Sequence, residues 1–454
     1  MTDTVSPAAP ARAEPTPAPA TFTYAAYGTG WIGGQVFRDV PAMVLLSFML
    51  TALEVPPAVA GAAIFIPKLW VVICDPLVGA LSDRTRSRFG RRRPYLFVGA
   101  ILCAVTFILL FRVPELATGT QRGIYVGVLY TIASTAFSIY SVPYLTLGSE
   151  LAATPHQRTV VMSWRQVGLG GGLLLGNVMP LLLVAWGGGN QPGYAFMGLV
   201  LGLACGATML VTVFGTARAA MPAPDDAAPV PLLDQVRLAA RNRPFLILLA
   251  GNFLQLVGSA AAYATIVFFV VYRLEEDFTF TSRMTLLMAL AVIVTPVFWT
   301  MAAKRFGKKP TFMFSIVMFI AAYLSFLLLS PGDHLATFVL SAAMGTFNCG
   351  FSLIAFSMLL DTIAHDRKIS GLNREGVFSG VWSAMDKTAF AFGALLAGLA
   401  LQAVGFVESA AGFAPQTPEA IRGIAIIFAG TPAVFAALAA LAMRGYRLKE
   451  SDVG

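Results

Sequence analysis

Charged residues are scarce in this chain, which excludes an ordinary soluble protein. Asp, Glu, Lys and Arg together make up 12% of the 454 residues. Soluble domains carry about 25% charged residues. Apolar residues make up 57% and gather in long runs that recur through nearly the whole chain. Because an apolar run of about 20 residues is long enough to span a bilayer, the sequence predicts an all-α polytopic membrane protein.

Cysteine and histidine are also rare, which argues against a disulfide scaffold, a zinc site and an enzyme. The cysteines lie inside apolar segments at spacings far from CxxC, so they are interpreted as small buried side chains. They are Cys74, Cys103, Cys205 and Cys349. The histidines, His156, His334 and His365, fall in predicted loops, and no Ser, His and Asp grouping or metal-ligand spacing is present. We therefore expect neither catalysis nor a bound cofactor or metal.

Twelve apolar windows predict twelve transmembrane helices. The windows are residues 26–52, 58–82, 95–112, 123–149, 160–187, 194–215, 245–272, 284–303, 311–330, 335–360, 377–404 and 421–443. The longest polar gap follows the sixth window, which predicts two six-helix halves at 24–217 and 244–445. A disordered cytoplasmic leader is predicted at 1–23, a linker with a short amphipathic surface helix at 218–243, and a cytoplasmic tail at 446–454.

Lys and Arg lie mostly in alternate loops, which predicts the orientation in the membrane. The loops that follow the even-numbered windows and the C-terminal end hold most of these residues. Since cytoplasmic loops carry the excess of Lys and Arg, both termini are predicted to be cytoplasmic, in a bacterial-type inner membrane. The basic run RFGRRRP at 88–94 is then an orientation signal, and no nucleic-acid partner is expected. The leader also lacks the apolar core of a cleaved signal peptide.

Two short patterns recur at about half the chain length. RFGRRRPYL at 88–96 follows the second window, and RFGKKPTF at 305–312 follows the eighth. Glu150 ends the fourth window, and Asp361 ends the tenth. The recurrence indicates parallel repeats, which place a substrate site at their interface near the membrane midplane.

Charged residues inside the predicted spans are few, and each needs a partner or a water-filled space, because burial costs at least about 2.5–3.5 kcal/mol. They are Arg38, Asp39, Lys68, Asp75, Arg165, Asp386 and Lys387. Asp75 is a candidate to bind and release a proton or to hold a cation, with Lys68 as the nearby cation on the same face of the helix. The alternative is a structural ion pair. Arg165 and Lys387 are candidates to pair with an aspartate or to donate hydrogen bonds to substrate hydroxyls.

Further charged residues at the ends of predicted helices form a candidate cytoplasmic gate. They are Asp83, Arg84, Glu150 and Asp361. Ion pairs between helices at this rim would hold the cytoplasmic side shut and would break on opening. The alternative is a set of solvated ion pairs, each worth under about 1 kcal/mol.

The segment DPLVGALSDRTRSRFGRRRP at 75–94 resembles the glycoside-pentoside-hexuronide:cation symporters of the major facilitator superfamily, and it is also similar to sucrose:proton symporters. VPYLTLGSEL at 142–151 and REGVFSGVWSAMDKTAFAFG at 374–393 extend the resemblance through both halves. The resemblance implies the major facilitator fold, alternating access, and a central sugar site beside a coupling cation.

The resemblance also implies roles for single residues. Asp75 matches a cation-site aspartate of the sodium-coupled members. Asp39 and Arg165 match sugar-contacting positions, and Lys387 matches the lysine of the eleventh helix.

Three positions depart from the family pattern. The second acid of helix 2 falls on Val71, the acid of helix 4 on Ser141, and the aromatic platform on Leu145. Because a sodium site needs several oxygen ligands, proton coupling through Asp75, or uncoupled transport, is favoured over sodium coupling. Ser141 and Leu145 are kept as candidate substrate-binding positions.

The sequence therefore predicts a monomeric, proton-coupled symporter of a sugar or glycoside that works in the lipid bilayer. One alternative is a carrier of an amphipathic solute, such as a lysolipid or a drug, in the same fold. A second is a membrane sensor that transports nothing.

Overall fold

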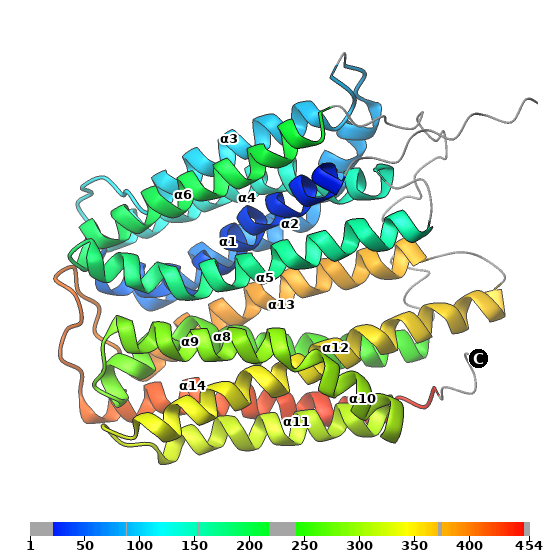
Figure 1. Cartoon of the computed structure of the whole chain (residues 1–454). Helices are drawn as coiled ribbons and strands as arrows, with labels where there is room; N and C mark the ends of the chain where they lie inside the picture. The colour runs from blue at the N-terminus through cyan, green and yellow to red at the C-terminus, as the bar shows by residue number, and fades with distance from the viewer. Residues whose placement is uncertain (1–20, 88, 152–154, 218–241, 371–374, 449–454) are drawn as a thin grey trace, which may run out of the picture.

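The computed structural model describes residues 21–87, 89–151, 155–217, 242–370 and 375–448. Long helices run side by side in alternating directions, and the helices of the first half lie above the others in Figure 1. α1 begins and α14 ends at the same end of the bundle (Figure 1). The predicted surface helix of the linker lies almost entirely outside the described residues.

The helices follow the predicted windows in order. The first are α1 (Thr21–Thr51), α2 (Pro57–Arg84), α3 (Arg93–Leu110), α4 (Gly119–Glu150), α5 (Pro155–Trp186) and α6 (Asn190–Gly215). The others are α8 (Arg243–Arg273), α9 (Phe278–Val294), α10 (Pro296–Phe306), α11 (Lys308–Ser325), the short 3₁₀ helix η1 (Phe326–Leu328), α12 (His334–Ser370), α13 (Glu375–Ala403) and α14 (Pro418–Met443).

Ten of the described helices are long and apolar enough to cross a membrane. α9 and α10 qualify only as a pair and are bent by 48°. The predicted single span at 284–303 is therefore broken, because Pro296 has no N–H for the helical ladder and its ring crowds the preceding turn. α1 does not qualify, since Gln35, Arg38 and Asp39 interrupt its apolar run. Ten of the twelve predicted spans are thus confirmed, and the other two stay a prediction.

Several helices extend beyond the apolar windows that predicted them. α12 continues to Ser370 and carries Arg367 and Lys368 in its last turn. Basic side chains near a helix C-terminus are favourable, but a hydropathy window does not detect such a polar extension. His334 and His365 are consequently helical, and His156 lies in the first turn of α5, so the prediction that the three histidines lie in loops was wrong. α1 likewise begins at Thr21, inside the predicted leader.

The two sets of helices pack in matching patterns. α1 packs on α5 and α6, α2 on α4, and α3 on α4 and α6. Correspondingly, α8 packs on α13 and α14, α9 on α12, and α11 on α12 and α14. The sets meet along α2 and α13, along α5 and α9, and along α1 and α8. This is the geometry expected of two parallel repeats, while the residue limits of the predicted domains stay a prediction.

Hydrogen bonds join the two halves at the end of the bundle where α1 ends. The N–H groups of Ser409 and Gly412 donate to the carbonyl oxygens of Leu50 and Thr51, at 3.0 Å in both cases. Nearby, the N–H of Ala58 donates to Oε1 of Gln402 at 3.1 Å. The loop after α13 is thereby held against the turn between α1 and α2.

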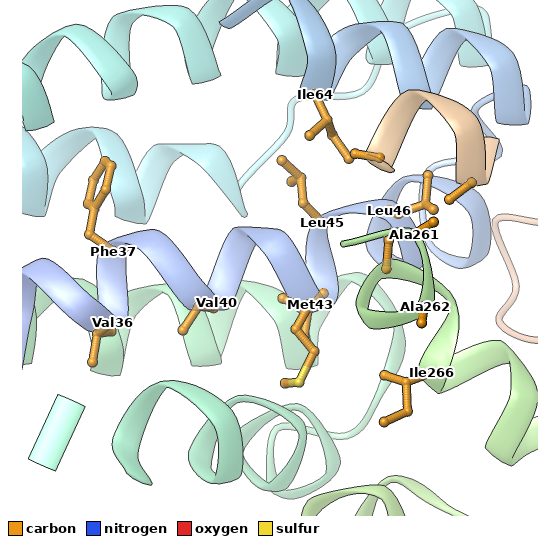
Figure 2. Close-up of a cluster of buried hydrophobic side chains, with 14 of the residues drawn as sticks. Val36, Phe37, Val40, Met43, Leu45, Leu46, Ile64, Ala261, Ala262 and Ile266 are labelled. Carbon is orange, nitrogen blue, oxygen red and sulfur yellow. The ribbon is translucent and has the colours of Figure 1, made fainter. Parts of the chain in front are cut away.

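An apolar cluster joins the halves close to these hydrogen bonds. Figure 2 shows Leu45 and Leu46 of α1 near Ile64 of α2 and Ala261 of α8. All of these side chains are buried. Lipid tails are as apolar as leucine, so close packing rather than removal from water stabilises such contacts.

Two glycines show how closely the helices approach one another. A Cβ at Gly398 of α13 would lie 2.4 Å from the carbonyl oxygen of Pro57 in α2, and one at Gly168 of α5 would lie 2.0 Å from that of Gly28 in α1. No side chain fits at these distances. Small residues of this kind let transmembrane helices pack backbone to backbone.

Candidate functional site

An ion pair joins the two halves partway along α2 and α13. The ammonium of Lys387 contacts Oδ2 of Asp75. The other carboxylate oxygen, Oδ1, is buried and has no hydrogen-bond partner among the described residues. Pro76, the next residue, removes one hydrogen bond from the helical ladder of α2. Of the aspartates considered as partners for Lys387, the fold therefore selects Asp75.

α1 carries a second group of polar side chains near the middle of the bundle. Gln35 Nε2 donates to Asp39 Oδ2 at 2.7 Å, and Arg38 Nε donates to Asp39 Oδ1 at 3.0 Å. α1 packs against α2, α4, α5, α6, α8 and α13, yet the side chain of Arg38 is 52% exposed. Since other helices surround α1, this exposed surface faces a space inside the bundle.

Asp386, the residue before Lys387, is tied to both halves. Nδ2 of Asn252 in α8 donates to Asp386 Oδ1 at 3.0 Å. Arg38 of α1 attracts the same carboxylate electrostatically. Gln35 and Asn252 were not among the residues predicted from the sequence, although a lone amide inside an apolar span is itself a signal, because it needs a polar partner there.

Arg165 of α5 lies against an aromatic stack formed by α1 and α4. The guanidinium carbon of Arg165 is 4.4 Å from the centre of the Trp31 ring. The rings of Trp31 and Tyr144 stack with centres 5.2 Å apart, and those of Tyr144 and Tyr27 stack 4.4 Å apart. Within the described part of the chain, Arg165 has no hydrogen bond and no ion pair, and its Nε atom is buried. The structure therefore does not bring Arg165 into contact with Asp39 or Lys387.

The remaining predicted site residues lie apart from these groups. The Lys68 ammonium is 5.5 Å from the centre of the Tyr130 ring, so it contacts an aromatic face and not Asp75. Ser141 is buried in α4, whereas Leu145, one turn further along the helix, is 45% exposed. Their predicted contact with substrate stays a prediction.

Matching ion pairs lie at the end of the bundle where α1 begins. Arg91 and Arg92 contact Oε1 of Glu150 at 2.6 Å and 3.3 Å, and Lys308 contacts Oδ2 of Asp361 at 2.6 Å. The two sites correspond in the repeats, because Arg92 and Lys308 each stand two residues before a proline. Each pair lies within one half of the chain. In this conformation these pairs do not connect the two halves, and their role as a gate stays a prediction.

The residue after Arg92 and the residue after Lys308 each bind the end of another helix. Nη2 of Arg93 donates to the carbonyl oxygen of Thr216 at 2.7 Å, after α6, and Nζ of Lys309 donates to that of Arg444 at 3.3 Å, after α14. A cation at a helix C-terminus is favourable because carbonyl groups there lack helical partners. Arg84 is exposed at the end of α2, and the side chain of Asp83 lies outside the described part of the chain.

A sequence family described as MFS/sugar transport protein matches residues 26–450. The chain belongs to this family. Its relatives include an isoprimeverose transporter of Lactiplantibacillus pentosus, 25% identical over 416 residues that cover 90% of this chain and 85% of that protein. They also include the inner membrane symporter YicJ of Escherichia coli (strain K12), 23% identical over 424 residues that cover 92% of this chain and 90% of that protein.

Solved structures share the fold of this MFS transporter. The D-xylose-proton symporter aligns with a TM-score of 0.67 at 15% identity, over 95% of this chain and 98% of that one. The major facilitator fold predicted from the motifs is confirmed, as is the function of a secondary transporter. The polar groups around Asp75, Lys387, Arg38 and Asp386 lie between the two halves, where repeats of this kind form their substrate and ion sites.

Proposed function

We propose that this MFS transporter carries a sugar or glycoside together with a proton by alternating access. The family description and the isoprimeverose transporter among the relatives support a sugar as the solute. The contact of Lys387 with Asp75 carries the proposal of coupling, because it is a charged contact between the halves that one proton can remove.

Asp75 has the surroundings expected of a proton-binding group. Its buried Oδ1 atom has no partner in the described part of the chain, so a proton can be placed there without breaking another hydrogen bond. Protonation removes the carboxylate charge and with it the attraction to Lys387, which is worth about 4 kcal/mol for charges 4 Å apart at an effective dielectric constant of 20. The contact between α2 and α13 weakens, and the two halves are freer to rearrange.

Sodium fits Asp75 less well than a proton. A hard cation needs several oxygen ligands, and the positions that supply further acids in the resembling family are Val71 and Ser141 here. The ammonium of Lys387 already lies against Asp75 and would repel a second cation.

We infer that both termini face the cytoplasm of a bacterial-type cell and that the chain acts as a monomer in its inner membrane. The bundle end at which α1 begins and α14 ends also carries Arg84, Lys308 and Arg444. Loops rich in Lys and Arg mark the cytoplasmic side of a membrane protein. The hydrogen bonds at Leu50 and Thr51 then lie on the outer side, as in an inward-facing state. One chain supplies both halves of the site, so a monomer suffices.

Uptake into proteoliposomes tests the function and the coupling ion together. A panel of glycosides is offered under an imposed pH gradient and, separately, under a sodium gradient. We expect accumulation driven by the pH gradient, and we expect Asp75→Asn to lose accumulation while it keeps exchange of solute. Undiminished accumulation in Asp75→Asn, or accumulation driven by sodium, would contradict proton coupling through this residue.

The same experiment discriminates the second candidate, a carrier of an amphipathic solute. The exposed Leu145 favours this candidate, because it puts an apolar side chain where the resembling family has an aromatic platform. Binding of a labelled lysolipid, together with no glycoside transport under either gradient, would replace the sugar proposal.

A further inference from the structure

A cavity lies at the end of the bundle where α14 ends, away from the polar groups between the two halves. Its volume is about 520 Å³, within the range of about 300–1,000 Å³ that is typical of small-molecule sites. The start of α11, the later part of α12 and the chain after α14 form its walls, which include Lys308, Lys309, Pro310, Asp361, Tyr446 and Arg447. Neither the sugar site nor the proton site proposed above includes this cavity.

The charge left in the lining of this cavity is positive. Lys308 Nζ donates to both carboxylate oxygens of Asp361, at 2.7 Å and 2.6 Å, and so compensates the negative charge of the lining. Lys309 Nζ donates to the carbonyl oxygens of Arg444 and Tyr446, at 3.3 Å and 2.5 Å. These acceptors carry no net charge, and an ammonium has three N–H donors. Lys309 therefore keeps its positive charge and one donor for a ligand.

Arg447 places a second cation at the same cavity. It is exposed, and it has no hydrogen bond or ion pair among the described residues. The residue before it, Tyr446, is 2% exposed, and its hydroxyl lies 3.2 Å from Oγ1 of Thr362 in α12. The buried Tyr446 fixes the backbone beside Arg447 and also accepts the hydrogen bond from Lys309. A guanidinium and an ammonium held close together are suited to bind a phosphate group.

An apolar stripe on α11 indicates which kind of phosphate compound fits. Pro310 lines the cavity and is exposed. Phe314, Val317 and Leu324 share its face of the helix, since the spacings are multiples of about three and four residues, and they are 53%, 56% and 43% exposed. In a membrane this face contacts lipid tails. A soluble phosphate compound makes no use of the stripe, whereas acyl chains can lie along it while the headgroup enters the cavity.

We propose that this cavity binds the headgroup of an anionic phospholipid, with the phosphate at Lys309 and Arg447 and the acyl chains along the stripe of α11. Basic pockets between transmembrane helices are suited to anionic headgroups. A zwitterionic phospholipid carries an additional cationic group, which the same two residues repel. The lipid contacts α11 and the segment after α14 together, so its binding stabilises the folded protein. The proposal does not depend on the identity of the transported solute.

Native mass spectrometry of the purified protein in detergent tests the proposal with two lipids that have the same acyl chains. Dioleoyl phosphatidylglycerol and dioleoyl phosphatidylcholine are titrated separately, and the Kd of the first bound lipid is measured. We expect phosphatidylglycerol to bind at least ~10-fold more tightly, a ratio that corresponds to about 1.4 kcal/mol. Arg447→Gln is expected to weaken phosphatidylglycerol binding ~5-fold, which corresponds to about 1 kcal/mol for one cation, and to leave phosphatidylcholine binding unchanged.

Two other variants locate the site. Arg84→Gln is the matched control, because Arg84 is also an exposed cation at this end of the bundle but belongs to α2 in the other half, and it is expected to keep the preference. Phe314→Ser removes an apolar contact and leaves both cations, so it is expected to weaken the binding of both lipids equally. If Arg447→Gln does not fold, an increase in ammonium acetate concentration with the wild-type protein is expected to weaken only phosphatidylglycerol binding, because salt screens exposed charges.

Three results would overturn the inference, each for a different reason. Equal Kd values for the two lipids, or unchanged phosphatidylglycerol binding in Arg447→Gln, would refute recognition of an anionic headgroup. An equal loss in Arg84→Gln would refute the location at this cavity. Displacement of phosphatidylglycerol by an equal concentration of sn-glycerol 3-phosphate would show that the cavity takes a soluble phosphate compound and that a lipid is not its occupant.

Discussion

The ion pair between Asp75 and Lys387 predicts a measurable coupling between two residues in opposite halves. Asp75→Asn leaves the ammonium of Lys387 without its partner, and Lys387→Gln leaves the carboxylate without its own. Removing one member of a buried pair costs about 3–5 kcal/mol. Here the side chains are 36% exposed for Lys387 and 20% for Asp75, and solvent screens exposed pairs. We therefore expect each single variant to lose only about 1–2 kcal/mol of unfolding free energy.

The double variant distinguishes an interaction from two independent losses. Asp75→Asn with Lys387→Gln leaves no unpaired charge, so its loss is expected to be smaller than the sum of the single losses by about 1 kcal/mol, within the range of about 0.5–3 kcal/mol found for contacting residues. The unfolding free energy is measured in lipid–detergent micelles for all four proteins.

A second cycle provides the control for the first. Lys68 lies on the same helix as Asp75 but contacts Tyr130, so Asp75→Asn and Lys68→Gln are expected to be additive within about 0.3–0.5 kcal/mol. If the losses of unfolding free energy in Asp75→Asn and Lys387→Gln are additive, the contact between α2 and α13 does not hold the halves together. The same conclusion follows if both cycles give the same coupling energy.

Three other contacts make sharp predictions. Gly168→Ala is expected to lower the unfolding free energy by about 1–3 kcal/mol, because the added methyl group overpacks against α1. Gly170→Ala has open space around its Cβ position and is expected to be neutral or stabilising. Equal thermal unfolding temperatures for the two variants would contradict this packing. Asn252→Leu removes the hydrogen-bond donor to Asp386 and is expected to lower the unfolding free energy by about 1–3 kcal/mol. Thermal unfolding measures this loss, with Asn252→Gln, which keeps an amide group, as the comparison. Lys309→Met removes the hydrogen bond to the backbone after α14 and is expected to speed amide hydrogen exchange there. Exchange after α6, where Arg93 binds, is expected to stay unchanged. Unchanged exchange in both segments would show that Lys309 does not stabilise the end of α14.

The partner of each buried charge could not be predicted from the sequence. Lys387 and Asp75 are 312 residues apart in the chain. The spacing of residues along one helix does not predict which helix of the other half packs against it. Lys68 and Asp75 share a helix, yet Lys68 contacts Tyr130 instead. The aromatic stack that holds Arg165 also depends on packing between helices, because its rings come from α1 and α4.

The membrane-spanning architecture, by contrast, was determined by the sequence alone. A bilayer offers no water to an exposed backbone, so long apolar runs must become helices, and ten predicted spans are confirmed for that reason. The repeat could also be read from local residues, because Arg92 with Glu150 and Lys308 with Asp361 recur in both halves. Only the tertiary structure decided which charges meet between the halves, because that choice depends on how two six-helix units of this chain pack against each other.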